Sequence, residues 1–234
     1  MKFFIVYAHQ EPQSFNAALL NLAKDVLLSQ NHEVIVSDLY KMQFNPVSGR
    51  HNFSMVKDST YYKQQVEEIY ATETDTFAID IKAELNKLDW CDMLIFQFPL
   101  WWFGMPAIMK GWVDRVFAMG KTYGGGKWYD QGVFQGKKAM LVLTTGGGDT
   151  MYSPTGLNGH MDQILFPINH GILYFVGFDV LPHFVAYGVS RISTEHRQAY
   201  LDKYKQRLLT INETPKISFQ SLADYDEAFQ LKTK

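Results

Sequence analysis

The sequence predicts an open, doubly wound α/β fold, in which a five-stranded parallel sheet carries helices on both faces and a short C-terminal appendage follows. Short apolar runs typical of buried strands alternate along the chain with segments whose apolar residues recur at helical spacing, which indicates successive β-α units. The length of 234 residues suits one large domain. We therefore expect a domain at residues 1–211 and a tail at residues 212–234, where the composition changes.

The first unit begins near the N-terminus. Lys2–Ala8 is a short apolar run that predicts a buried strand. The helix expected after it has one apolar face, made by Phe15, Ala18, Leu19, Leu22, Ala23, Val26 and Leu27. By the same criteria, further strands are expected at His32–Asp38, Asp92–Phe98, Lys138–Thr145 and Phe178–Gly188.

Helices are expected between and after these strands, at residues 80–88, 106–117, 159–174 and 194–209. The stretch from Leu39 to Ile79 is too long for a simple connection, so we expect a helix near residues 61–70 within it. Five strands in this arrangement fit the order 2-1-3-4-5, the flavodoxin-like form of the doubly wound fold. In such sheets, ligands bind beyond the carboxyl ends of the strands, where the strand order reverses.

Composition and charge narrow the function classes. A net charge of −2, with scattered Lys and Arg, argues against nucleic acid and anionic membranes as partners. The chain has a single cysteine, Cys91, no signal-type start and no run of 18 apolar residues, so we expect a soluble, cytoplasmic protein without membrane insertion. The seven histidines form no i, i+4 pair on a predicted helix, so no metal site is expected.

Three unusual loops follow the first, third and fourth strands, and the fold brings these strand ends to one crevice. HQEPQSFN lacks G-x-G-x-x-G but places Ser14 and Asn16 at a helix start, where backbone N–H groups can hold a phosphate. PLWWFG offers rings for stacking, and TTGGG lets the backbone approach a flat ligand. Taken singly, the first loop is better explained as a plain helix cap, whereas the second is as well explained as a partly buried aromatic run and the third as a flexible turn. Together they describe a flavin site.

One motif points to a different ligand. MGKT at Met119 is similar to the end of a P-loop. However, Arg115 stands at the upstream glycine position, and a helix rather than a strand is expected before the motif. We therefore expect that this segment binds no nucleotide phosphate.

The order of several longer motifs identifies a family. Between Phe4 and Pro215 the chain contains, in this order, AHQEPQSFNAAL, SDLYKMQFNPV, IFQFPLWWFGMPAIMKGWVDRV, YDQGVFQGKKA, TTGGGDTMYSPTGLNG, LFPINHGIL and VGFDVL. The chain thereby resembles the FAD-dependent NAD(P)H quinone reductases of the DT-diaphorase family, including the branch that uses dihydronicotinamide riboside. The resemblance implies an NAD(P)H dehydrogenase (quinone). Such a flavoprotein transfers a hydride from NAD(P)H, or a smaller dihydronicotinamide, through FAD to quinones in a two-electron ping-pong reaction.

The resemblance also assigns roles to residues. The FAD-binding positions are His9, Ser14, Phe15 and Asn16 at the pyrophosphate, Pro99, Leu100, Trp101, Trp102 and Phe103 beside the isoalloxazine ring, Thr144, Thr145, Gly146 and Gly147 beneath it, Tyr152 at its pyrimidine end and Arg197 near the adenosine. The catalytic positions are Tyr152 and Asn158, the second of which is histidine in some relatives. The substrate-binding positions are Trp102, Phe103, Tyr123, Gly125, Trp128, Met151 and Phe175.

In this family a second subunit completes the cavity, so the resemblance implies a homodimer. The residues expected to act across its interface are Tyr123, Gly125, Trp128 and Phe175. The metal site of the riboside branch keeps only His170 here, because Tyr174 replaces a second histidine, which again predicts no metal. Two other functions stay open: a flavin-binding regulatory subunit of a potassium efflux system, and an FMN electron carrier.

Overall fold

The computed structural model, which describes residues 1–232, confirms the doubly wound α/β fold. Five parallel strands follow the order β2-β1-β3-β4-β5, and a further short strand, β6, pairs with β4. Their bounds are β1 Lys2–Tyr7, β2 Glu33–Asp38, β3 Met93–Pro99, β4 Lys138–Thr144, β5 Asp179–Val180 and β6 Phe184–Ala186. The predicted strand order is therefore confirmed, and the first four strands lie within one residue of their predicted bounds.

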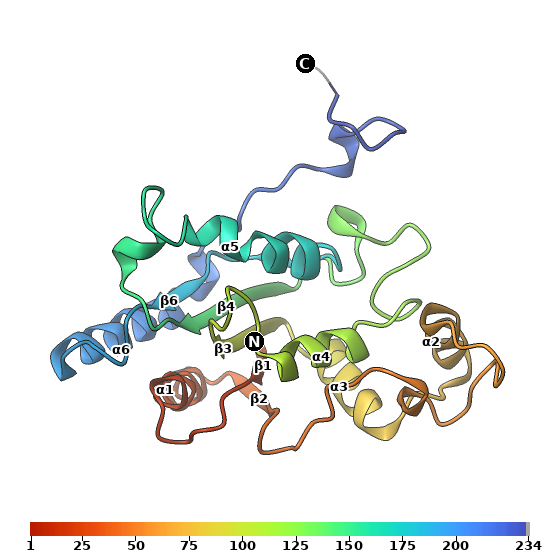
Figure 1. Cartoon of the computed structure of the whole chain (residues 1–234), viewed down its shortest axis with the longest axis horizontal. Helices are drawn as coiled ribbons and strands as arrows, with labels where there is room; N and C mark the ends of the chain where they lie inside the picture. Colours follow the sequence, from red (N-terminus) through yellow and green to blue (C-terminus); the bar gives the residue numbers. More distant parts are fainter. Residues whose placement is uncertain (233–234) are drawn as a thin grey trace.

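Helices cover both faces of this sheet (Figure 1). Their bounds are α1 Phe15–Ser29, α2 Gln64–Thr74, α3 Ile79–Trp90, α4 Ala107–Val116, α5 Met161–Ile168 and α6 Thr194–Leu209. Helices α1 and α6 pack against one set of strand side chains, such as Ile5, while α3, α4 and α5 pack against the alternate set, such as Phe4. Within residues 1–232, no helix is long and apolar enough to cross a membrane.

The fifth predicted strand is interrupted, so the prediction of one continuous strand at Phe178–Gly188 is wrong. Val180 of β5 pairs with Ala139, and Phe184 of β6 pairs with Val142. Between these two pairs, β4 advances by three residues while the segment that contains Pro182 advances by four. Proline has no N–H to donate to the ladder, so the segment bulges there and resumes pairing two residues later.

The helix predicted at residues 159–174 also changes character. It begins as α5, which contains Pro167, and continues as a π-helix at Asn169–Tyr174. In the wider turn, the Phe175 N–H donates to the His170 carbonyl, five residues earlier, at 3.0 Å. Proline inside a helix removes one donor and crowds the preceding turn, and widening of the helix after it is the physical consequence that we infer.

The long connection between β2 and α3 contains α2, which begins three residues later than predicted. Hydrogen bonds and close packing attach this connection to α4. Arg115 of α4 is buried, and its guanidinium donates to the Asn52 side chain and to the Asp80 carboxylate, each at 2.8 Å. A methyl group on Gly111 would overlap Pro46, so this helix and the connection meet at backbone distance. The connection is therefore a packed part of the domain.

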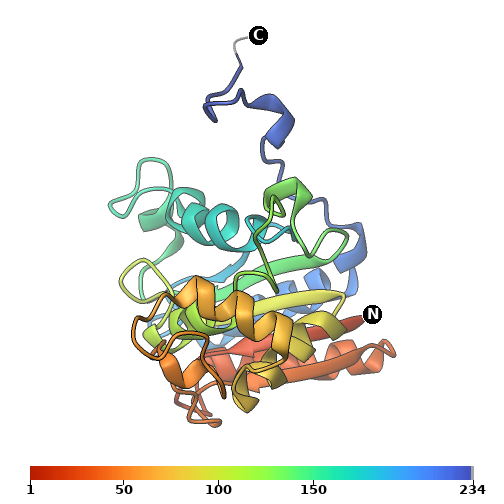
Figure 2. The same cartoon turned by 90° about the vertical axis from the view of Figure 1, so that its right-hand side faces the viewer.

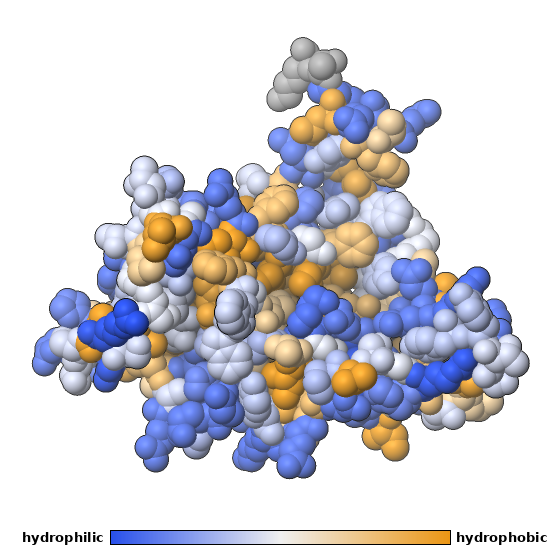
Figure 3. All heavy atoms as spheres, in the orientation of Figure 1, coloured by the Kyte–Doolittle hydropathy of each residue, from blue (hydrophilic) through white to orange (hydrophobic). Residues whose placement is uncertain are grey.

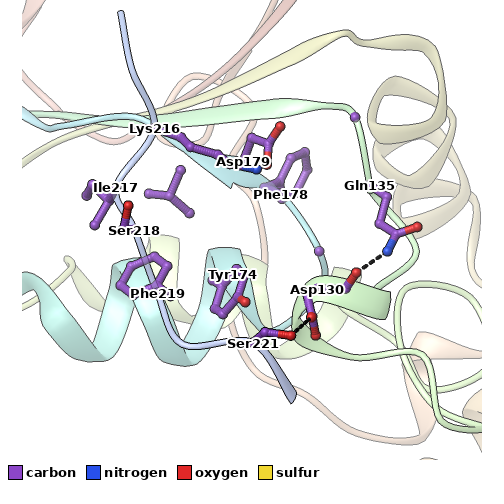
Figure 4. A pocket seen from close by; sticks show the side chains of 13 residues that line it. Asp130, Gln135, Tyr174, Phe178, Asp179, Lys216, Ile217, Ser218, Phe219 and Ser221 are labelled. Carbon is purple, nitrogen blue, oxygen red and sulfur yellow. Dashed lines mark hydrogen bonds and ion pairs between the residues drawn. The ribbon is translucent and has the colours of Figure 1, made fainter. Parts of the chain in front are cut away.

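The tail runs along the edge of the sheet and then stands away from the body of the molecule (Figure 2). The Ile217 N–H donates to the Val180 carbonyl at 2.7 Å, so the tail covers the edge strand β5. Farther on, the Ser221 hydroxyl donates to the Asp130 carboxylate at 2.5 Å. Figure 4 shows the cavity of about 400 Å³ that these contacts border, with both charged and aromatic side chains in its wall.

Candidate functional site

The three loops singled out by the sequence meet at the carboxyl ends of β1, β3 and β4. The Ala8 N–H donates to the Gln97 carbonyl at 3.0 Å, which ties the end of β1 to β3. The Leu100 N–H donates to the Thr144 carbonyl at 2.9 Å, which ties β3 to β4. The strand order reverses between β1 and β3, so these loops border the crevice where doubly wound proteins bind ligands.

The first loop ends in a capped helix with an unusual buried amide. The Ser14 hydroxyl accepts from the Ala17 N–H at 3.1 Å, as an N-cap residue does. Asn16 is only 1% exposed, and its Nδ2 donates to the Thr144 hydroxyl at 2.6 Å. Within residues 1–232, the Asn16 Oδ1 atom is buried without a hydrogen-bond partner. An unpaired acceptor of this kind is costly, and a donor supplied by a ligand at the helix start would satisfy it.

His9 and Phe15, the other two residues predicted for this end of the crevice, lie in the loop before α1 and at its first residue, respectively. His9 accepts from the Glu11 N–H through Nδ1 at 3.0 Å, and burial lowers its pKa below the usual value, so its ring is neutral at pH 7. Phe15 is half-buried against the core layer beneath α1. The helix start therefore presents backbone N–H groups and neutral side chains, a set that suits a phosphate without a lysine or arginine.

The aromatic loop presents its rings to solvent. Trp102 is 97% exposed, while Trp101 and Phe103 are exposed to a smaller extent. Trp102 and Phe103 have φ angles of 50° and 59°, in the left-handed region that non-glycine residues adopt at a cost of order 1–3 kcal/mol. Pro99 is the last residue of β3 and Leu100 is half-buried, so these two form the base of the loop. The reading of the Trp-Trp-Phe run as partly core is therefore wrong.

The glycine loop lies under a tyrosine ring. The Thr145 hydroxyl donates to the Gly147 carbonyl at 2.7 Å, which fixes the turn, while Gly146 has open space where a side chain would stand. A Cβ atom on Gly147 would lie 3.2 Å from Cε2 and 3.4 Å from the hydroxyl of Tyr152. The Asn158 N–H donates to the Met151 carbonyl at 2.9 Å. This bond places Asn158 beside Met151, the residue that precedes Tyr152, so the three predicted site residues of this region lie together.

A cavity of about 370 Å³ lies between the glycine loop and α6. Arg197 is not among its lining residues, because its Nε atom donates to the Val189 carbonyl at 3.0 Å. The cavity is instead bordered by Gly148, Asp149, Tyr187, Ile192, His196, Ala199, Tyr200 and Lys203. Burial raises the pKa of Tyr187 to about 12. The roles assigned from the sequence included none of these residues, and the four that lie on α6, His196, Ala199, Tyr200 and Lys203, belong to no motif that the sequence analysis used.

The other predicted substrate residues form a second, separate group. Tyr123 and Trp128 lie with ring centroids 5.5 Å and 6.5 Å from that of Phe175. Gly125, in the same loop, has a φ of 61° and open space around it. Figures 1 and 2 show that the loop at residues 119–132 lies on a different side of the molecule from the loop that follows β4. The structure thus assembles these aromatics, but away from the crevice of their own chain.

His170, the one position retained from the metal site of the riboside branch, lies among aromatic rings. His170 stacks on Phe166 with ring centroids 4.7 Å apart and contacts Tyr174 and Phe219. Burial lowers the pKa of His170. Among residues 1–232, no three His, Cys, Asp or Glu side chains gather in a group that could hold a metal ion. The absence of a metal stays a prediction.

The sheet order and the crevice at its switch point define an α/β protein of flavodoxin-like fold. The family described by that fold matches residues 1–208. Within it, the chain belongs to the family of NAD(P)H and ribosyldihydronicotinamide quinone reductases, and it is an oxidoreductase of that family.

Three similar proteins carry this assignment. The rat NAD(P)H dehydrogenase [quinone] 1 is 42% identical over 227 residues, which cover 97% of this chain and 83% of that protein. The human ribosyldihydronicotinamide dehydrogenase [quinone] is 42% identical over 211 residues, covering 90% and 91%. The crystal structure of a protein described as a putative quinone reductase from Klebsiella pneumoniae superposes with a TM-score of 0.96 at 41% identity, covering 99% and 94% of the two chains.

Proposed function

We propose that the protein reduces quinones with a hydride from NADH, NADPH or a smaller dihydronicotinamide, using FAD in a two-step, ping-pong reaction. The observation that carries this proposal is the pairing of an open glycine loop with Trp102 and Phe103, which are held exposed at the neighbouring strand end. A flat cofactor between these loops would keep one open face, on which donor and quinone would stack in turn. When bound, the flavin supplies the hydride chemistry.

The residues around the crevice fit such a cofactor. The backbone N–H groups at the start of α1, which the Ser14 cap orders, would hold the phosphate end, while a hydroxyl group of the cofactor could donate to the Asn16 Oδ1 atom. The open backbone at Gly146 and Gly147 would meet the edge of the ring system, and the Tyr152 hydroxyl beside it can donate a hydrogen bond there. FAD rather than FMN is supported by the cavity between the glycine loop and α6, which has room for a further ring.

We further propose that two copies form a homodimer with shared cavities. Tyr123, Trp128 and Phe175 make an aromatic wall that lies apart from their own crevice, which supports a role for this wall in the crevice of another copy. Figure 3 shows apolar side chains gathered over the face that carries α5, where Phe166 is exposed. Such a patch is typical of an interaction surface. In this proposal, residues 1–211 perform the chemistry and residues 212–234 remain an appendage, in a cytoplasmic protein.

The cofactor and the reaction can be tested together. Protein purified in the presence of both FAD and FMN should release about one FAD per chain on acid treatment, and it should oxidise NADH or NADPH with a panel of quinones. Chromatographic recovery of FMN alone would contradict the adenosine site. Bound flavin without quinone turnover would favour a regulatory subunit of a potassium efflux system, and purely one-electron transfer would favour an FMN electron carrier.

The dimer makes a separate prediction. Phe166→Glu places a charge on the apolar face of α5 and should shift the protein from dimer to monomer in light scattering, with a matching loss of turnover. Leu28→Glu is the matched control, because Leu28 of α1 is 53% exposed and Phe166 is 52% exposed. The control should stay dimeric and active. A wild-type monomer with full activity would refute the shared cavity.

A further inference from the structure

The loop that carries Tyr123 is built on the MGKT segment. The Gly120 N–H donates to the Tyr123 carbonyl at 2.8 Å, and the Thr122 hydroxyl donates to the Ala118 carbonyl at 3.1 Å. Both bonds close the loop upon itself, so the position of Tyr123 depends on where Met119 and Gly120 are held. Helix α4 precedes the segment, as expected, whereas a P-loop follows a strand, and the absence of nucleotide phosphate binding stays a prediction.

A buried carboxylate on α2 holds the start of this loop. Glu68 is 3% exposed, and its Oε2 atom accepts from the Met119 N–H at 2.7 Å. Its Oε1 atom accepts from the Gln64 side chain at 2.8 Å. Both donors are neutral, and burial raises the pKa of Glu68 above the usual value. A buried carboxyl group without a cationic donor is a poor means of stabilising a fold, which favours a role in positioning.

Other contacts bring the same loop against α2. Gly120 has a φ of 89°, and a Cβ atom there would lie 3.3 Å from the Thr72 hydroxyl, so a larger residue could not approach as closely. The Gln65 side chain lies 3.4 Å from the Tyr123 hydroxyl, within hydrogen-bond distance. The far side of the loop is tied to α3 by Lys121, whose Nζ atom lies 2.7 Å from the Asp89 carboxylate. Helix α2 is therefore the support against which Tyr123 is set.

We propose that Glu68 is a positioning residue that sets the distance between α2 and the aromatic wall of the substrate cavity. This inference rests on the proposed function, because it takes Tyr123 as part of that wall. The Glu68 carboxylate reaches the Met119 N–H from α2 at 2.7 Å, so a side chain one methylene shorter would leave this N–H without the bond that holds the loop.

The test compares three substitutions of Glu68 in the flavin-loaded, full-length protein. Glu68→Ala removes the acceptor and Glu68→Asp keeps the charge but withdraws it by one methylene, so both should release the loop. Glu68→Gln keeps an acceptor at the same reach and should restore most of the wild-type behaviour. The matched control is Glu67→Gln, because Glu67 is equally buried on α2 but accepts from the Lys57 and Asp58 N–H groups.

Two measurements decide the outcome. In the Ala and Asp variants, the KM for the quinone should rise about tenfold while kcat changes less, as expected for loss of one well-placed hydrogen bond. Trypsin should also cleave after Lys121 faster than in the wild type and in the Glu67→Gln control. If Glu68→Ala fails to fold, the Asp and Gln variants give the same comparison.

Unchanged KM and unchanged cleavage in the folded Ala or Asp variant would overturn the proposal. So would wild-type behaviour of Glu68→Asp together with a defect in Glu68→Gln, because charge rather than reach would then matter. A wild-type protein that turns over no quinone would refute only the proposed function. The trypsin comparison would still decide whether Glu68 holds the loop.

Discussion

Tyr152→Phe is expected to slow the reduction of the bound flavin by roughly 10- to 1000-fold, the range for removal of one preorganised donor from an active site. The Tyr152 ring rests against Gly147, and the loop at residues 149–152 fixes its direction. The substitution keeps the ring and removes only the hydroxyl, so the affinity for the cofactor should change little. Reduction of the flavin should slow because the variant lacks the Tyr152 hydroxyl, which would donate a hydrogen bond to negative charge developing beside the glycine loop.

Stopped-flow absorbance at saturating donor measures this rate directly. Tyr187→Phe, measured at saturating FAD, is the matched control, because its ring packs against that of Tyr152 with centroids 5.7 Å apart but borders the cavity proposed for the adenosine end of the cofactor, away from the ring that is reduced. The control should reduce at nearly the wild-type rate. If Tyr152→Phe does so too, Tyr152 serves only to pack over the glycine loop, and its catalytic assignment is wrong.

The strand order could be predicted because each buried strand leaves a strong local signal. β3 is apolar except for Gln97, β4 is apolar from Ala139 to Leu143, and a parallel sheet with helices on both faces is the arrangement that buries both sides of such strands. The last helix, Thr194–Leu209, has the predicted bounds, because Ser193 caps its start through its hydroxyl. Local chemistry alone was sufficient for these elements.

The split of the fifth strand and the π-helix followed from single prolines, whose effect depends on the neighbouring element. Pro182 interrupts pairing only because its segment lies beside β4, and Pro167 lies inside a helix whose continuation is set by packing. A proline in a sequence signals a break, but its form depends on contacts that are distant in sequence.

The candidate site shows the same division. The motifs located the loops around Asn16, Trp102 and Gly147, because each follows a strand whose place in the sheet is predictable. They did not locate the cavity beside α6, or the packing of Tyr123 against Phe175 with ring centroids 5.5 Å apart. Both depend on how a long loop is folded onto a helix. The assigned roles of all these residues stay predictions.

The substitution Asn16→Asp is expected to leave the crevice without its cofactor. The Asn16 amide is 1% exposed, and its Nδ2 donates to the Thr144 hydroxyl at 2.6 Å. A carboxylate cannot donate this bond, and at neutral pH it would place a buried negative charge next to the phosphate end of the proposed site. Like charges placed together cost several kcal/mol, so the dissociation constant for FAD should rise by about 100-fold or more.

Flavin fluorescence on titration of the cofactor-free protein measures this constant, and Asn169→Asp is the matched control. Asn169 is 4% exposed and also has a buried, unpaired Oδ1 atom, but it lies in the π-helix, on the other face of the sheet from α1. Both variants bury a new carboxylate and should unfold at a lower temperature, since a buried charge is costly in either place. Only Asn16→Asp should lose the flavin. Tight binding of FAD by folded Asn16→Asp would show that the phosphates lie elsewhere, because a ligand anion cannot share that helix start with a buried carboxylate at no cost.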